Sequence, residues 1–299
     1  MTINPPAEHK LTRALVLAGG GVSGVAWELG LLTALARAGT DFSQVDLVVG
    51  TSAGSVVGTQ LTTGADLEKV FATQLAPVAQ SLEKTVDFDI NQFQQMIMEQ
   101  VKQHGMNAQA VRAGIGQKAL AAQTVAEEER KAIIAARLPV HQWPAQRLLI
   151  TAVEAQSGDW VVFDQNSGVN LVEAVAASCA VPLVWPTVTI NGHSYMDGGM
   201  RSGTNADLAV GYDRVLVLVP LPQPPNIPPV LGSNLEVEKA LLEKQGSQVL
   251  IIAADEAAIK AMGANVLDPA NRAASAQAGL AQGAALAQVV RQFWFEMAD

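Results

Sequence analysis

The pentapeptide "GTSAG", residues 50–54, places a serine where nucleophilic chemistry is favoured. The apolar run "DLVVG" (46–50) precedes it, and the helical pattern "SVVGTQLTTG" follows it. A sharp turn from a strand into a helix exposes the central hydroxyl, and its neighbours must be small because a Cβ would clash there. We therefore expect Ser52 to be a nucleophile, with Gly50 and Gly54 forming its elbow. The alternative is an ordinary turn serine that caps the next helix.

A glycine loop at residues 19–24 forms the second candidate site. In "LVLAGGGVSGVAWELG" (15–30), Gly19, Gly21 and Gly24 spell GxGxxG after an apolar run. Bare amides at a helix start could hold either a dinucleotide pyrophosphate or the oxyanion of an acyl-transfer reaction. A dinucleotide fold needs an acidic residue at the end of its second strand, whereas Asp46 lies at the beginning of that strand. The oxyanion is the favoured interpretation.

A base is needed to take the proton of a serine hydroxyl. The chain has four histidines, His9, His104, His141 and His193, and none has a context that demands a catalytic role. The carboxylate with the most suggestive setting is Asp197 in "YMDGG", where two glycines allow the backbone to approach closely. An aspartate beside glycines is also a common turn residue.

The elements around these residues alternate between apolar runs and helical patterns, which is typical of an α/β protein. Strands are predicted at 14–18 and 46–50, with a helix at 24–38 between them. Further strands are predicted within 147–165, where two flank a turn at 157–159, and at 187–190, 214–220 and 248–253. We expect one domain, residues 1–299, with a mostly parallel central sheet flanked by helices and a flexible tail at 1–12.

Residues 66–137 lack any convincing strand and are predicted to be a helical insertion or lid. Within them Phe93, Ile97 and Val101 recur at helical spacing and are joined by Met96, so that one face is apolar. That face could simply pack on the core, or it could cover an apolar substrate. Phe93, Met96 and Ile97 are accordingly candidate substrate-binding residues, and the exposed stripe is a candidate for peripheral membrane contact.

Two further segments have clear local character. The proline-rich "PLPQPPNIPP" (220–229) is followed within about 20 residues by an apolar strand, which indicates a stiff surface loop. The last 30 residues are predicted to form a long alanine-rich helix whose end is docked by Trp294 and Phe295.

Composition excludes several classes of function. The chain has 299 residues, 49% of them hydrophobic, and 28 acidic against 19 basic side chains give a net charge of -9, which repels a nucleic-acid backbone. The single cysteine, Cys179, excludes an intramolecular disulfide and is predicted to be a small buried hydrophobe. We expect no metal or other cofactor, because no zinc-binding or calcium-loop spacing is present. No signal peptide or membrane span is visible, which favours a cytoplasmic protein.

Four motifs together resemble the patatin-like phospholipase family: "AGGGVSG", "GTSAG", "AVAASCAVPLVWPTVTINGHSYMDGG" and "NADLAVGYDRVLVLVP". The resemblance covers most of residues 13–220. It implies a three-layer α/β/α fold and a serine hydrolase that cleaves acyl esters of lipids without a histidine. By position, Ser52 would be the nucleophile, Asp197 its base, and the amides of Gly19, Gly20 and Gly21 the oxyanion hole.

One departure from the family concerns the glycine loop. Many members carry lysine or arginine where this chain has Ser23. A cation there could help to bind an anionic headgroup, so its absence leaves a neutral ester or a lysolipid open as the substrate. Two other functions stay open: an acyltransferase that uses the same dyad, and a non-catalytic lipid-binding module that retains the fold.

Overall fold

The computed structural model describes residues 11–222 and 229–295. Nearly all of the predicted tail, and most of the predicted proline-rich loop, therefore lie outside the described residues. Within them, eight strands form one sheet in the order β5-β6-β3-β2-β1-β7-β8, with β4 paired to β3. The strands are β1 (Arg13–Leu17), β2 (Leu47–Gly50), β3 (Leu148–Glu154), β4 (Trp160–Phe163), β5 (Val188–Ile190), β6 (His193–Asp197), β7 (Arg214–Val219) and β8 (Gln248–Ala253).

The sheet has a parallel centre and an antiparallel edge. Strands β3, β2, β1, β7 and β8 run parallel to one another. Strands β4 and β6 run antiparallel to β3, and β5 runs antiparallel to β6. The prediction of a mostly parallel sheet thus holds for the five central strands, while short hairpin connections make the β4–β6 region antiparallel. The carboxyl ends of β1 and β2 are neighbours, which brings the glycine loop next to the predicted serine elbow.

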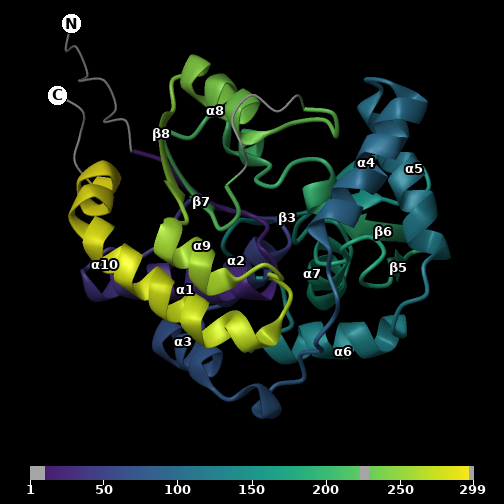
Figure 1. Cartoon of the computed structure of the whole chain (residues 1–299). Coiled ribbons are helices and arrows are strands. Elements are labelled where there is room, and N and C mark those ends of the chain that lie inside the picture. Colours follow the sequence, from purple (N-terminus) through teal and green to yellow (C-terminus); the bar gives the residue numbers. More distant parts are fainter. Residues whose placement is uncertain (1–10, 223–228, 296–299) are drawn as a thin grey trace, which may run out of the picture.

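Helices cover both faces of the sheet, so the fold has three layers (Figure 1). One face packs on α1 (Gly21–Arg37), α2 (Ala53–Thr62), α7 (Leu171–Ser178), α9 (Glu256–Met262) and α10 (Arg272–Phe295). The other face packs on α8 (Leu235–Lys244) and the short helix η3 (Ala206–Ala209), and further along on α4 (Ile90–His104) and α5 (Ala108–Ala121).

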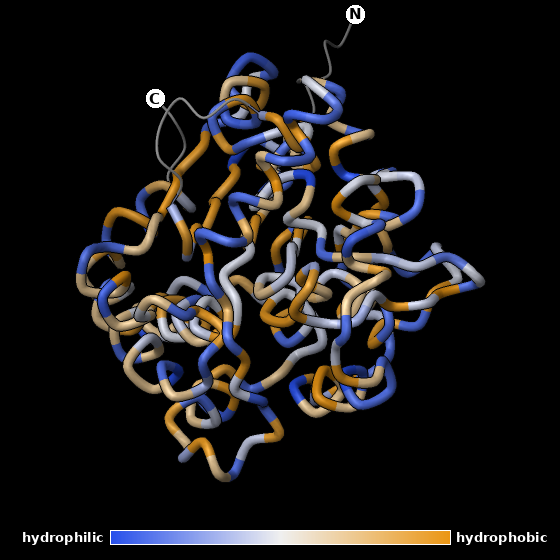
Figure 2. The backbone as a smooth tube through the Cα atoms, turned by 45° about the vertical axis from the view of Figure 1, so that its right-hand side comes forward, coloured by the Kyte–Doolittle hydropathy of each residue, from blue (hydrophilic) through white to orange (hydrophobic). Residues whose placement is uncertain are grey.

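Strand β1 shows why the central strands are apolar throughout. Leu15 and Leu17 point to the face under α1 and α2, whereas Ala14 and Val16 point to the face under α8. A strand buried on both sides cannot alternate with polar residues. Figure 2 shows the consequence as hydrophobic stretches along the strands, with hydrophobic and hydrophilic stretches alternating along the helices.

The described residues within 66–137 contain helices and no strand, as predicted. They form α3 (Leu67–Leu75), the short helix η1 (Val78–Gln80), α4 (Ile90–His104), α5 (Ala108–Ala121) and α6 (Glu127–Arg137). Phe71 of α3 packs against α1 and α10, whereas α4 and α5 pack on the opposite face. This segment therefore crosses the edge of the sheet and contributes to both layers. Whether it acts as a lid stays a prediction.

The predicted C-terminal helix is α10, which lies along α1 (Figure 1). Trp294 is buried and its ring lies 5.0 Å from that of Phe42, as the docking prediction requires, but Phe295 is largely exposed. None of the helices in the described ranges combines the length and apolar character needed to cross a membrane.

Candidate active site

Ser52 occupies a strained turn between β2 and α2. Its backbone has φ 51° and ψ -113°, a conformation that L residues rarely adopt and that clusters at functional sites. The flanking glycines are required by contact: a Cβ on Gly54 would lie 2.0 Å from the Leu17 carbonyl oxygen, and one on Gly50 would lie 2.6 Å from the Gly54 carbonyl oxygen. Both positions therefore admit only glycine, and the role of this turn as a nucleophile elbow stays a prediction.

Hydrogen bonds from three sides fix the backbone of Ser52. Its amide donates to the Ser178 hydroxyl at 2.9 Å. Its carbonyl oxygen accepts from the Ser55 hydroxyl at 2.7 Å and from the Cys179 thiol at 3.2 Å. Cys179 is buried, and burial raises the pKa of its thiol, so it lies beside Ser52 as a neutral donor. Its predicted burial is confirmed, but its hydrogen bond to Ser52 had no signal in the sequence.

The glycine loop lies against the elbow. A Cβ on Gly19 would be 3.5 Å from the Ser52 Cβ. The Gly19 amide is already used, because it donates to the Gly203 carbonyl at 2.9 Å. The amides of Gly20 and Gly21 have no backbone acceptor among the described residues, and Gly21 begins α1. Of the predicted oxyanion set, Gly20 and Gly21 hold available donors at a helix start, where the helix dipole favours negative charge.

Asp197 ends β6 and meets Ser52 in space, although 145 positions separate them in the chain. Its amide donates to the Ala180 carbonyl at 3.0 Å, and its carboxylate accepts from the Gly199 amide at 2.8 Å. Burial raises the pKa of Asp197 to about 6; the Gly199 amide, a hydrogen bond with the Ser52 side chain and the charge of Arg130 act in the opposite direction. A carboxylate with such a pKa can accept a proton near neutral pH.

Among the described residues, no histidine is involved in this arrangement. His193 pairs with Glu154 at 2.8 Å on the surface, and the His141 ring contacts the Ala135 carbonyl at 3.0 Å. His104 ends α4, and His9 lies outside the described residues. Over the same ranges no group of three His, Cys, Asp or Glu side chains is placed to hold a metal ion.

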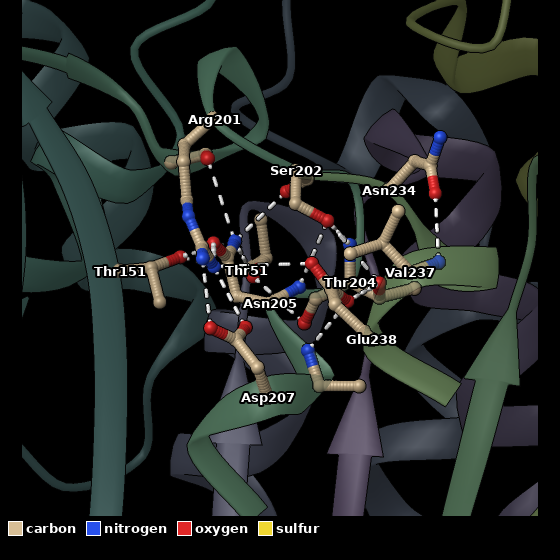
Figure 3. A network of polar contacts seen from close by, with 12 residues as sticks. Thr51, Thr151, Arg201, Ser202, Thr204, Asn205, Asp207, Asn234, Val237 and Glu238 are labelled. Carbon is tan, nitrogen blue, oxygen red and sulfur yellow. Dashed lines mark hydrogen bonds and ion pairs between the residues drawn. The ribbon is translucent and has the colours of Figure 1, made fainter. Parts of the chain in front are cut away.

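Asn205 ties the two halves of the site together (Figure 3). Its side-chain amide donates to the Thr51 hydroxyl at 3.0 Å, and to the carbonyls of Ser202 at 2.8 Å and Gly198 at 3.4 Å. Thr51 precedes the serine, and Gly198 follows the aspartate. Asn205 is fully buried in a left-handed conformation, φ 50°, which asparagine tolerates better than most residues. The motif "NADLAVG" contains it, but the pattern alone gave no reason to assign it a role.

The same polar network extends to α8. Glu238, fully buried, accepts from the Ala206 amide at 2.8 Å and from the Thr204 hydroxyl. Burial raises its pKa above the usual range. Figure 3 shows these groups packed between the strand ends and α8. Glu238 of α8 thus holds the segment from Arg201 to Asp207, which in turn supports the glycine loop and the turn at Ser52.

Ser23 stands where many family members carry a basic residue in the glycine loop, and this position is buried. Ser23 is fully buried: its amide donates to the Val266 carbonyl at 3.0 Å and its hydroxyl to the Met262 carbonyl at 3.4 Å. The cation that acts on Asp197 comes instead from α6, where the Arg130 guanidinium lies 3.7 Å above the ring of Trp185. Sequence reasoning missed Arg130, which stands in the charged run "EEERK".

The wall of a cavity of about 440 Å³ includes Val56, which lies one helical turn after Ser52 in sequence. Val22 of α1 and Val56 of α2 belong to its wall, and they follow the glycine loop and the elbow closely in sequence. The remaining wall comes from α3, from residues 76–83, from α6 and from the start of α10. Its volume lies within the roughly 300–1,000 Å³ of small-molecule sites.

The predicted substrate residues lie elsewhere. Met96 is buried, and Phe93 and Ile97 are partly buried, in a cluster with Val111 and Ile115 of α5. None of the three lines the 440 Å³ cavity. The apolar face of α4 therefore packs on its neighbours, and a substrate role for these side chains stays a prediction.

Serine hydrolases commonly place a serine on a strand-to-helix turn that faces a glycine loop, and this chain has the same arrangement. The sequence matches the family model described as patatin-like phospholipase over residues 15–210. The chain therefore belongs to the patatin-like phospholipase family, as its motifs predict. The match ends before β7, so the last two strands of the sheet and α8–α10 lie outside it.

Among solved structures, the chain is similar to VipD from Legionella pneumophila, with 13% identity, a TM-score of 0.43, and coverage of 95% of this chain and 67% of that one. It is also similar to the type III effector protein ExoU, with 16% identity, a TM-score of 0.44, and coverage of 93% of this chain and 53% of that one. The chain thus spans about half the length of ExoU. No curated protein sequence matches it.

Proposed function

We propose that this protein hydrolyses acyl esters of lipids through an acyl-enzyme on Ser52, with Asp197 as its base. The observation that carries the proposal is the proximity of these two residues: Ser52 lies on a strained turn, and its side chain is close enough to the buried carboxyl group of Asp197 to lower the raised pKa of that group. Family membership supports lipid esters as the substrate class.

In the first step the Ser52 hydroxyl gives its proton to the Asp197 carboxylate while Oγ attacks the ester carbonyl carbon. The carbonyl oxygen becomes an anion, which the Gly20 and Gly21 amides can stabilise. The carbon–oxygen bond to the leaving alcohol then breaks, and the alcohol takes the proton from Asp197. The products are the free alcohol and an acyl group esterified to Ser52.

In the second step a water molecule replaces the alcohol. Asp197 accepts a proton from the water as its oxygen attacks the acyl carbonyl, and the collapsing intermediate returns a proton to Ser52 Oγ. The carboxylic acid leaves and the dyad is restored. Each well-aimed amide is worth about 3 kcal/mol at the oxyanion, so the glycine loop supplies a large part of the rate. The valine wall of the cavity suits the acyl chain.

The test uses a fluorophosphonate probe and a short p-nitrophenyl ester. We expect wild-type protein to be labelled at Ser52, as read by peptide mass spectrometry, and to turn over the ester. Ser52→Ala should lose both properties, whereas Ser167→Ala, an exposed turn serine, should keep them. A folded wild-type protein that is neither labelled nor active would instead support a lipid-binding module without catalysis.

An acyltransferase would share the first step and differ only in the acceptor. Product analysis in the presence of glycerol separates the two reactions. We expect free fatty acid as the main product; predominant transfer of the acyl group to glycerol would assign the alternative activity.

A further inference from the structure

A group of buried charges adjoins the cavity. Arg137 of α6 donates to both oxygens of Glu83 at 2.6 Å, through Nε and Nη2. Arg130, two turns earlier on α6, has Nη1 4.0 Å from the same carboxylate. Arg272, the first residue of α10, acts on Glu83 and Arg137 through its charge and is held by the oxygens of Ser81, Thr73 and Ala76.

Positive charge exceeds negative charge in this group. The guanidinium groups of Arg130, Arg137 and Arg272 all interact with the single carboxylate of Glu83. Of these three, Arg130 is the one that also interacts with the charge of Asp197. Burial lowers the pKa of Arg130 to about 9, which still leaves it cationic at neutral pH. The Glu83 side chain is 7% exposed, and the Arg130 and Arg137 side chains are 4% and 12% exposed. Uncompensated charge at such burial is costly, which points to an anion that the apoprotein does not supply.

Unused hydrogen-bond donors accompany the excess charge. Arg130 Nε and Nη1 and Arg272 Nε are buried without an acceptor among the described residues. Buried polar groups are normally satisfied, and an orphaned donor indicates a missing partner. Arg272 has five N–H donors and places three of them on protein oxygens, so it is held rigidly and keeps two donors, one of them on Nε, for a further acceptor.

The cavity joins this cationic group to an apolar wall. Arg137, Arg272 and Glu83 line one part of it, and Val22, Val25 and Val56 line another. Gln60, one turn beyond Val56 on α2, donates to the Arg137 carbonyl at 2.7 Å and also lines the cavity. The apolar wall thus includes residues that closely follow the glycine loop and Ser52 in sequence, and Gln60, further along α2, contacts the part of the wall that holds Arg137.

We propose that the cavity binds an amphiphile with an anionic end, its alkyl chain along the valines and its phosphate or carboxylate against Arg272 and Arg137. Guanidinium groups bind both oxyanions through paired N–H donors. Two lipids carry this chemistry: a phospholipid with its headgroup phosphate and a released fatty acid with its carboxylate. The first would make anionic lipid esters the preferred substrates, which rests on the proposed function; the second would make the cavity a product site.

The test measures binding of decyl phosphate, decanoate and decanol to the full chain by titration calorimetry below their micelle concentrations. None of these probes has a carboxylic ester bond, which is the bond that the proposed reaction cleaves, so the result is independent of turnover and of Ser52 labelling. We expect at least one anion to bind at least about tenfold more tightly than decanol, the difference that a charged hydrogen bond supplies. Tighter phosphate binding identifies a headgroup site, and tighter decanoate binding a product site.

The matched variants are Arg272→Gln and Arg291→Gln, both on α10; Arg291 is exposed at the other end of the helix. Arg272→Gln should abolish most of the preference for the anion, and Arg291→Gln should retain it. Equal affinities for decanol and both anions in wild-type protein would overturn the proposal, as would an unchanged preference in folded Arg272→Gln. If Arg272→Gln does not fold, the wild-type comparison still decides.

Discussion

At the scale of single residues, the proposed mechanism depends on an aspartate that is buried away from water. An exposed aspartate would be ionised and well hydrated at neutral pH, and therefore a weak base. Burial raises the pKa of Asp197 to about 6, while the Gly199 amide, the Ser52 hydroxyl and Arg130 prevent it from rising further. These opposing influences leave the carboxylate ionised at pH 7 with a pKa close enough to that pH for efficient proton transfer.

The pKa of Asp197 predicts how the reaction rate falls at low pH. Because the base must be ionised, kcat/KM for a soluble ester should rise tenfold per pH unit at low pH and level off above about pH 6. Arg130→Gln removes the cation that lowers this pKa, so its limb should move to higher pH. Rate measurements from pH 4 to pH 9 check both profiles. A limb near pH 4 in wild-type protein would contradict the assignment of Asp197 as the base.

The same burial should reduce the stability of the fold. Between the ordinary value of 3.8 and about 6, folded protein keeps a proton on Asp197 that unfolded chains have lost, so the unfolding free energy falls as pH rises through this window. Asp197→Asn keeps an oxygen for the Gly199 amide and has no charge to bury. We expect this inactive variant to exceed wild-type protein in unfolding free energy by up to about 3 kcal/mol at pH 8.

At pH 4 and below this advantage should disappear, because wild-type Asp197 is then protonated in the folded state. Urea denaturation at the two pH values measures the difference. Asp87→Asn, at an exposed position, serves as the control and should match wild-type protein at both. A variant less stable than wild-type protein at pH 8 would show that the charge of Asp197 is not a cost to the fold.

At the scale of elements, local patterns predicted the parts of the site but not the contacts that join them. An apolar run, a small-residue turn and a helical pattern are contiguous in sequence, so the turn from β2 through Ser52 into α2 could be predicted. Asp197 could be located by its glycines and by family resemblance. Asn205 and Arg130 could not, because their partners lie on other elements and no spacing marks them.

Asn205 joins three elements, and its removal should affect both activity and stability. Its amide links the turn after β2 to the Gly198 carbonyl after β6, and it also reaches the Thr151 hydroxyl of β3 at 3.3 Å. Asn205→Gly and Asn205→Ala both lose these bonds, and we expect each to lower kcat at least tenfold while Ser52 remains labelled. Deleting buried hydrogen bonds costs about 1–3 kcal/mol.

Comparison of the two variants separates the side chain from the backbone. Alanine at a left-handed position costs about 1–2 kcal/mol that glycine avoids, so Asn205→Ala should unfold at lower urea concentration than Asn205→Gly. Their kcat values should be similar. If kcat stays at the wild-type value in both variants, the hydrogen bonds of Asn205 do not position the dyad.

At the scale of the whole molecule, the sheet could be predicted because buried strands are apolar in any surroundings, whereas the route of residues 66–137 could not. The period of a helix shows that it has an apolar face but not which face of the sheet receives it. Phe71 reaches one side of the sheet and Met96 the other, through connections whose course no local pattern encodes. For the same reason the apolar side chains left exposed by this segment became evident only in the fold.

Those exposed side chains bear on contact with a lipid surface. Leu75, Val78 and Leu82 are 39%, 39% and 63% exposed in the segment that runs past the cavity, and Leu82 also lines it. Phe93, Ile97 and Val101, predicted to make such a contact, are partly buried in their own cluster. We therefore propose that peripheral contact is made by the 75–82 segment. The net charge of -9 gives no general attraction to anionic lipid, so burial of apolar side chains must supply the affinity.

Leu82→Asp tests this contact most directly. Placing a leucine in lipid is worth about 1.5–3 kcal/mol, so the variant should bind neutral phosphatidylcholine vesicles at least about tenfold more weakly in a sedimentation assay. Val289→Asp makes the same chemical change at a 53% exposed position on α10, away from the cavity, and should bind like wild-type protein. Binding of wild-type protein should also be insensitive to salt, because charge does not drive it. If both substitutions weaken vesicle binding equally, the 75–82 segment does not make the contact with lipid. If binding depends strongly on salt, burial of apolar side chains is not the driving force.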